Sequence, residues 1–145
     1  MSDKVFVDTN ILVYAHDRAA GAKHERARAL VEKLWKAEGA VISTQVLQEL
    51  CVSVGRKSER PLTVEETQCL IEDYTAWDVI VNTAESIVEA LAIESRYNIS
   101  FWDALIIQAA GSSGAAILYS ENLADGQRYG SVRVVNPLRD EAISA

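Results

Sequence analysis

Short apolar runs alternate along the chain with longer segments of helical periodicity. Residues 5–7, 40–42, 79–81 and 117–119 are wholly apolar, and residues 132–135 are apolar apart from Arg133, a pattern that is typical of buried strands. Between these runs, apolar residues recur at intervals of three and four, the spacing of a helix with one buried face. We therefore predict an α/β fold with a mostly parallel sheet of about five strands flanked by helices.

Several of the predicted helices carry recognisable end signals. The segments predicted as helices are residues 11–15, 23–35, 43–55, 63–77, 83–98 and 100–111. Thr63 and Glu66 have the spacing of a capping box, and Asn98 tolerates the left-handed conformation that ends many helices. The polar stretch 55–61 is predicted to be a loop.

Length and composition indicate one soluble domain. The chain has 145 residues, of which 49% are hydrophobic and 24% charged, so we expect one domain over residues 1–145 with a loosely ordered tail from about residue 137. No apolar run approaches the roughly 18 residues of a spanning helix, and the start lacks a signal-peptide core, so we expect a cytoplasmic protein with no membrane contact. Cys51 and Cys69 lack metal-ligand spacing and are expected to be buried, reduced thiols.

The charge balance is acidic. Fourteen basic and 21 acidic residues give a formal net charge of −7, which argues against a protein that holds nucleic acid by a broad cationic surface alone. Crowded carboxylates that bind a divalent cation would also make a chain acidic. A plain acidic protein has the same balance, so charge alone does not decide between them.

Asp8 stands at the end of the first predicted strand. Together with Thr9 and Asn10 it separates two apolar runs, and the carboxyl ends of parallel strands are where functional sites collect. An ionised acid buried there costs several kcal/mol unless a cation or hydrogen-bond donors meet it. Alternatively, Asp8 and Asn10 cap the helix that starts near Ile11, a role that does not exclude metal binding.

Two further acids lie on predicted helices. Glu49 borders the buried stripe of its helix, although a helical glutamate taken alone is usually solvated. Asp103 shares an apolar face with Ile106 and Ile107 in the first turn of its helix. Its alternative role is the return half of a capping box with Ser100, which the spacing permits.

These acids fall within three motifs that resemble those of the PIN-domain ribonucleases. Residues 5–14 (VFVDTNILVY) resemble the opening motif, and residues 42–49 and 99–106 match the second and third in the same order. The resemblance spans nearly the entire chain. Within this family, the chain is similar to the VapC-like toxins of type II toxin–antitoxin pairs. This resemblance implies a PIN-like fold and a Mg/Mn-dependent endoribonuclease, a hydrolase whose catalytic and metal-binding residues include Asp8, Glu49 and Asp103.

The resemblance also implies partners and supporting residues. The substrate would be RNA, cut at a phosphodiester, and a cognate antitoxin and a homodimer are expected. Clustered carboxylates suit Mg²⁺ or Mn²⁺, one ion activating water and another stabilising the leaving oxygen. Thr9, Asn10 and Ser120 would orient carboxylates or waters, or else serve only as turn and cap residues.

The fourth motif departs from the family pattern. Many relatives have Thr/Ser-x-Asp after the last internal strand, whereas Ser120-Glu121-Asn122 places an asparagine at the aspartate position. Glu121 or Asp125 could supply the missing charge, directly or through a water. The alternatives are a weakened second metal site or an inactive descendant.

Basic side chains gather in two segments of the chain, residues 23–28 and 56–60. Phosphates could be guided by Lys23, His24, Arg26, Arg28, Arg56, Lys57 and Arg60, although an ordinary solvated face is the better explanation for each of them taken separately. A haloacid-dehalogenase-type phosphatase needs an acid where this chain has Asn10, and a receiver domain needs an aspartate where it has Asn82. The strongest non-enzyme alternative is a degenerate PIN fold that acts as a non-catalytic binding module.

Overall fold

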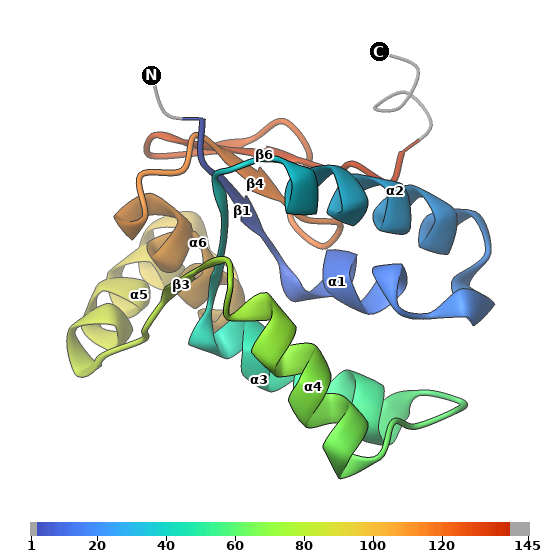
Figure 1. Ribbon diagram of the computed structural model, residues 1–145. Helices are drawn as coiled ribbons and strands as arrows, with labels where there is room; N and C mark the ends of the chain where they lie inside the picture. Colours follow the sequence, from blue (N-terminus) through green and yellow to red (C-terminus); the bar gives the residue numbers. More distant parts are fainter. Residues whose placement is uncertain (1–2, 140–145) are drawn as a thin grey trace.

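A computed structural model describes residues 3–139 of the chain (Figure 1). The strands are β1 (Val5–Val7), β2 (Ala40–Ser43), β3 (Asp78–Ile80), β4 (Ile117–Tyr119), β5 (Arg128–Tyr129) and β6 (Val132–Val135). The α-helices are α1 (Thr9–Ala15), α2 (Ala22–Lys36), α3 (Thr44–Val52), α4 (Val64–Tyr74), α5 (Ala84–Tyr97) and α6 (Phe101–Ser112). A 3₁₀ turn, η1 (Arg18–Ala20), precedes α2, and a π-helical turn, η2 (Ser53–Lys57), follows α3.

Within the described residues, the strands form one sheet in the order β3-β2-β1-β4-β6-β5. All neighbouring strands are parallel except β5 and β6, and β1 lies between β2 and β4 with Phe6 opposite Val41 and Leu118. The predicted mostly parallel α/β sheet is confirmed. Strand β5 was not predicted, because an antiparallel strand of two residues is too short to show an alternating pattern.

The central strands are buried on both faces, which is why their sequences are continuously apolar. Phe6, Val7, Val41, Ile42 and Leu118 have no exposed surface. Helix α6 packs against β2, β4 and β6 and carries α5 on its outer side, while α1 packs against α2 and α3. Figure 1 shows α5 and α6 on one side of the strands and α1 and α2 on the other.

The helix ends follow the local signals closely. Thr63 and Glu66 form the predicted capping box, and Asn98 ends α5 in the left-handed conformation, with φ 54°. Helix α3 ends at Val52 rather than at residue 55, because the chain widens into the π-helical turn η2 over part of the predicted loop. Of the two reduced cysteines, Cys69 is exposed because it lies on the polar side of α4, so its predicted burial is wrong.

The last described residues remain attached to the domain. Leu138 is buried, and Arg26 donates a hydrogen bond to its carbonyl oxygen at 3.3 Å. The rest of the tail predicted to be loosely ordered, residues 140–145, lies outside the described residues. Across residues 3–139, no helix has the length and apolar character needed to span a membrane.

Candidate active site

The strand order places Asp8 at a topological switch point. After β1 the chain builds β2 and β3 on one side, and it later returns to place β4 on the other side of β1. Loops from the carboxyl ends of such strands diverge and leave a crevice, which is where ligands bind in open α/β sheets. The segment that follows β1 opens on this crevice, and its first residue is Asp8.

Asp8 is buried and surrounded by hydrogen-bond donors. Only 5% of its surface is exposed. Its Oδ1 accepts the backbone N–H of Thr9 at 2.7 Å, and its Oδ2 accepts the Ser120 hydroxyl at 2.8 Å and the Asn10 amide at 3.3 Å. Asp8 is also the N-cap residue of α1. The capping interpretation is therefore confirmed for Asp8 but wrong for Asn10, which lies inside α1 because the helix begins at Thr9. The Asp8 carboxylate is also joined to the end of β4 through Ser120.

The pKa of Asp8 is raised from 3.8 to about 6. Burial is the largest cause, the hydrogen bonds from Ser120 and Thr9 oppose it, and the negative charges of Glu49 and Asp103 raise the pKa further. Glu49 and Asp103, which were predicted from separate motifs, therefore both lie within electrostatic reach of Asp8. A cation bound among them would relieve both the desolvation and the repulsion.

Replacing Asp8 by asparagine is expected to stabilise the metal-free protein at pH 7. An acid with a raised pKa in the folded state lowers stability above that pKa, and this cost disappears as pH falls from about 6 to 3.8. The difference corresponds to about 3 kcal/mol, and imperfect hydrogen bonds of the amide should offset part of it. We expect Asp8→Asn to raise the free energy of unfolding by about 1–2 kcal/mol at pH 7.

Urea unfolding in the presence of a chelator, at pH 7 and at pH 4, measures this effect. The advantage of Asp8→Asn should shrink toward pH 4, where wild-type Asp8 is protonated. Asp73→Asn, which removes an exposed aspartate of α4, should keep the wild-type pH dependence. An advantage of Asp8→Asn that is equal at both pH values would contradict the burial cost.

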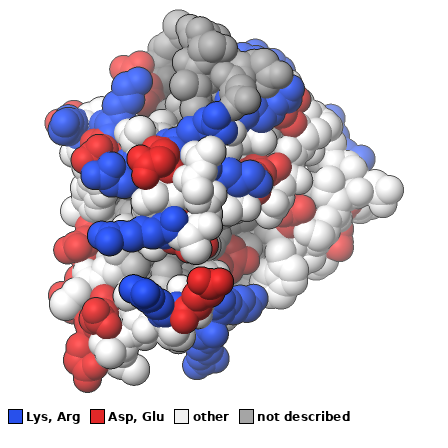
Figure 2. Space-filling view, turned by 90° about the vertical axis from the view of Figure 1, so that its right-hand side faces the viewer, with Lys and Arg blue, Asp and Glu red and all other residues white. Residues whose placement is uncertain are grey.

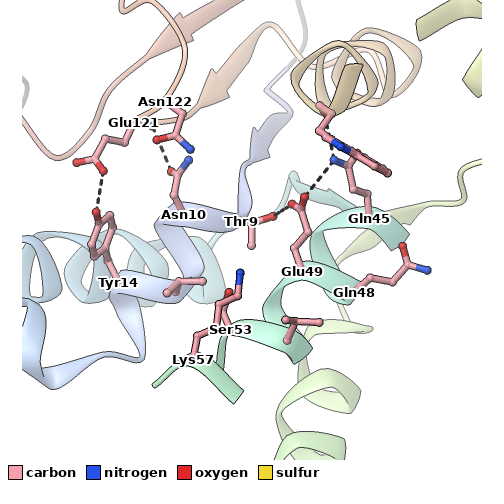
Figure 3. A pocket seen from close by; sticks show the side chains of 13 residues that line it. Thr9, Asn10, Tyr14, Gln45, Gln48, Glu49, Ser53, Lys57, Glu121 and Asn122 are labelled. Carbon is pink, nitrogen blue, oxygen red and sulfur yellow. Dashed lines mark hydrogen bonds between the residues drawn. The ribbon is translucent and has the colours of Figure 1, made fainter. Parts of the chain in front are cut away.

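Glu49 is held by two side chains. The Thr9 hydroxyl donates to its Oε1 at 2.6 Å, and the Gln45 amide donates to its Oε2 at 3.4 Å (Figure 3). Thr9 thus contacts Asp8 through its backbone and Glu49 through its side chain. Sequence reasoning missed Gln45, which lies one helical turn before Glu49, a spacing that places both side chains on one face of α3.

Asp103 lies in the first turn of α6 and is half-buried. Its backbone N–H donates to Ser100 Oγ at 3.1 Å, so Ser100 caps the helix. The reciprocal half of a capping box is not formed, and within residues 3–139 the Asp103 carboxylate accepts no hydrogen bond. The capping role does not explain this carboxylate, which is left available to a ligand.

The remaining polar residues link the loop after β1 to the loop after β4. Ser120 is fully buried, and besides donating to Asp8 it accepts the backbone N–H of Asn122 at 3.3 Å. Asn10 donates to Asp8 and accepts the backbone N–H of Glu121 at 3.1 Å. Asn10 and Ser120 therefore fix the position of the Asp8 carboxylate relative to the segment that contains Asn122.

Glu121 is already paired with neighbouring side chains. Its Oε1 accepts the Tyr14 hydroxyl at 2.8 Å, and its Oε2 lies 2.6 Å from the Lys23 ammonium. Burial alone would raise the pKa of Glu121, but the hydrogen bonds from Lys23 and Tyr14 outweigh it and lower the pKa. The Glu121 charge is therefore largely neutralised by Lys23.

Asp125 is directed to a different part of the protein. Its Oδ1 accepts the backbone N–H of Asn136 at 2.9 Å, and its Oδ2 pairs with Arg139 at 2.6 Å. It does not line the cavity beside Glu49. These contacts tie the loop before β5 to the segment after β6.

An open cavity of about 710 Å³ lies beside the acids (Figure 3). Its lining comprises Thr9, Asn10, Val13, Tyr14, Gln45, Gln48, Glu49, Val52, Ser53, Lys57, Trp102, Glu121 and Asn122. Asp8 does not line it but is linked to its wall through Thr9 and Asn10. The cavity offers space for a substrate next to Glu49.

The donor set fits a hard divalent cation in its chemistry. Asp8, Glu49, Asp103 and Asn122 lie at one end of the sheet and carry carboxylate and amide oxygens, which Mg²⁺ and Mn²⁺ prefer. As the side chains stand, no three acidic, histidine or cysteine groups among residues 3–139 are close enough together to hold an ion. Binding would require Glu49 or Asp103 to turn toward Asp8.

Comparison with known protein families identifies the family of this chain. The PIN domain model matches residues 5–124, which contain Asp8, Glu49 and Asp103. The chain belongs to the PIN-domain family. Among curated proteins, no sequence matches it.

Solved structures share the PIN fold of this chain. A toxin–antitoxin complex from Klebsiella pneumoniae is 20% identical, with a TM-score of 0.68, over 92% of this chain and 98% of that one. VapC20 of Mycobacterium tuberculosis, described as a sarcin–ricin loop cleaving toxin, is 21% identical, with a TM-score of 0.65, over 82% and 90%. DNA-bound VapBC from Salmonella typhimurium is 21% identical, with a TM-score of 0.59, over 92% and 97%.

Proposed function

We propose that this PIN-domain protein is a divalent-metal-dependent endoribonuclease and the toxin of a toxin–antitoxin pair. The observation that carries the proposal is the position of Asp8 at the switch point of the sheet, beside an open cavity, with Glu49 and Asp103 close enough for their charges to act on it. The similarity to a toxin that cleaves the sarcin–ricin loop and to toxin–antitoxin complexes supports the choice of RNA as substrate and of an antitoxin as partner.

Each residue of the site has a role in this proposal. Asp8, Glu49 and Asp103 would hold Mg²⁺ or Mn²⁺, which supplies a Lewis acid to activate water and to neutralise charge on the phosphodiester. Thr9 orients Asp8 and Glu49 together, because it donates to both. No side-chain nucleophile is required, so the buried hydroxyl of Ser120 serves to hold Asp8 rather than to attack phosphorus.

RNA must reach this site on an acidic protein. Helix α2, η2 and the following loop carry the exposed side chains of Lys23, Arg28, Arg56, Lys57 and Arg60. Figure 2, which shows the molecule from the right-hand side of Figure 1, displays Lys and Arg side chains spread over one face with acidic side chains between them. We propose that Lys57, which lines the cavity, guides phosphates toward Glu49.

The proposed partners are a cognate antitoxin and a second copy of the chain. Helix α5 leaves Ile87, Val88 and Leu91 exposed at 46%, 67% and 51%, and these positions lie along one side of the helix. Exposed apolar strips of this kind are typical of protein–protein contacts. They support an assembled state of the protein.

Incubation of the purified protein with labelled single-stranded RNA tests the activity. Cleavage is expected with Mn²⁺ or Mg²⁺ and should stop when a chelator is added. An Asp103→Asn preparation made in the same way controls for contaminating nuclease. RNA that stays intact under all conditions would instead support a non-catalytic binding module on a PIN fold.

Restoring a carboxylate at position 122 is expected to strengthen metal binding. Asn122 lines the cavity, and Asn122→Asp would add a charged ligand close to Asp8. We expect the metal concentration for half-maximal cleavage to fall by about 3- to 10-fold, because affinity rises with the number of charged ligands. The measurement is cleavage rate against Mn²⁺ concentration.

The two neighbouring acids provide matched controls. Asp125→Asn and Glu121→Gln should leave the metal dependence unchanged, because Arg139 and Lys23 already neutralise these acids. If Asp125→Asn instead cripples cleavage and Asn122→Asp adds nothing, Asp125 is the fourth acid. The pairing with Arg139 would then have to break when metal binds.

A further inference from the structure

Trp102 is a large apolar side chain exposed beside the candidate acids. It precedes Asp103 in the first turn of α6, and 62% of its surface is exposed. It also lines the cavity that Glu49 borders. Its ring makes a T-shaped contact with Phe101, with the ring centroids 5.2 Å apart, and this contact still leaves most of the Trp102 surface open to solvent.

The other two tryptophans have a structural explanation. Trp77 is buried, and the partly exposed Trp35 packs against both Trp77 and Tyr74, with ring centroids 5.0 and 5.3 Å apart. These rings form an aromatic cluster that stabilises the fold. Trp102 belongs to no such cluster, so packing does not account for an indole at this position.

Trp102 is also held in a fixed relation to Glu49. The Gln45 amide donates to the carbonyl oxygen of Trp102 at 3.1 Å and to the Glu49 carboxylate at 3.4 Å. Gln45 is 3% exposed, so this bridge between α3 and α6 is protected from water. The first turn of α6 is thereby positioned in advance relative to Glu49, as a substrate-binding group should be.

Tyr14 is the other aromatic residue that lines the cavity, but it is already engaged. Its hydroxyl donates to Glu121, and the Lys23 ammonium lies 5.2 Å from its ring centroid. Trp102 therefore presents the accessible aromatic face among the lining residues. On the same cavity, Lys57 forms no ion pair with the residues that the structure describes and can meet a phosphate.

We propose that Trp102 is the platform on which one unpaired base of the RNA stacks, next to the phosphodiester that is cut. The inference rests on the proposed ribonuclease function and adds that the substrate is single-stranded or splayed open at this point. Stacking on an aromatic ring tolerates any base, and unstacked bases of single strands are its usual targets. Trp102 is thus a positioning residue that sets the register of the strand relative to Asp103 and Glu49.

RNA binding is measured separately from cleavage. The probe is a fluorescein-labelled, single-stranded RNA of 12 nucleotides and mixed sequence, about as long as the stretch that a single-strand-binding domain covers. Fluorescence anisotropy is measured with Ca²⁺ in place of Mn²⁺, and gels check that the strand stays intact. Trp102→Ala should raise the Kd by about 10- to 100-fold, the range expected for loss of one stacked base. Trp102→Phe should recover most of the affinity.

Val64→Ala is the matched surface control. Val64 is also highly exposed, at 71%, but lies on α4 and does not line the cavity. This variant should bind RNA as wild type does. Thermal melts of all variants establish that each is folded.

Cleavage kinetics distinguish stacking from a general structural role. On a strand that wild type cuts at one bond, Trp102→Ala should raise KM more than it lowers kcat. Removing the base at single nucleotides near this bond should reproduce the effect at one position in wild type. At that position, Trp102→Ala and the abasic nucleotide together should have no more effect than either alone.

Each outcome decides the proposal. Unchanged RNA binding and cleavage in Trp102→Ala would overturn the proposal and leave the ribonuclease function standing. The same holds if the effects of Trp102→Ala and of the abasic nucleotide add up at every position tested. The exposed indole would then suit a protein partner. Weaker binding by Trp102→Ala, rescued by Trp102→Phe, from a protein that cuts no RNA would retain the stacking platform and overturn the nuclease. RNA that wild type neither binds nor cuts would overturn both.

Discussion

Asp103→Asn is expected to lower RNA cleavage by about 100-fold or more while the protein stays folded. The carboxylate of Asp103 accepts no hydrogen bond within residues 3–139, and the helix cap uses its backbone N–H, which asparagine keeps. The substitution therefore removes a negative charge and little else. Loss of one charged metal ligand removes several kcal/mol of transition-state stabilisation, and a 100-fold effect needs only about 3 kcal/mol.

Single-turnover cleavage of labelled RNA with saturating Mn²⁺ measures the cleavage rate, and urea unfolding measures the free energy of unfolding. Asp73→Asn serves as control, because it makes the same chemical change on an exposed part of α4. Wild-type cleavage by Asp103→Asn would remove Asp103 from the site. A large loss of stability with unchanged metal affinity would instead assign Asp103 to the support of α6.

Divalent metal is expected to stabilise the wild-type protein by about 2–3 kcal/mol at a concentration 100 times its Kd. On the proposed function, the ion would bind the assembled carboxylates of the folded state and not the unfolded chain, and it would remove the repulsion that Glu49 and Asp103 exert on Asp8. For a domain of this size the shift in Tm is about 5–10 °C. Asp8→Asn should lose most of this gain.

The same measurement across pH separates this explanation from nonspecific binding. Metal must displace the proton from Asp8, whose pKa is about 6, so the stabilisation should be larger at pH 7 than at pH 5. Asp125→Asn should keep the full effect, because its carboxylate is paired with Arg139. Equal Tm values with millimolar Mn²⁺ and with chelator would show that the carboxylates do not form a metal site of useful affinity.

The sequence by itself determined the elements of this protein and the acids at their ends. Short apolar runs predicted five of the strands, and they are clearest in the central strands, which are buried on both faces and therefore exclude polar residues. Local signals predicted the capping box of Thr63 and the left-handed end at Asn98, since both depend on residues only a few positions apart. The motifs around Asp8, Glu49 and Asp103 predicted the family, which the PIN domain match confirms.

Tertiary structure decided how these acids are supported and which of their neighbours are neutralised. Ser120 donates to Asp8 across 112 positions of sequence and Thr9 donates to Glu49 across 40, contacts that arise only when β4 and β2 take their places beside β1. Likewise, the pairing of Glu121 with Lys23 depends on how α2 packs near the end of β4. Such contacts follow from the burial and packing of whole elements, and no local pattern of residues encodes them.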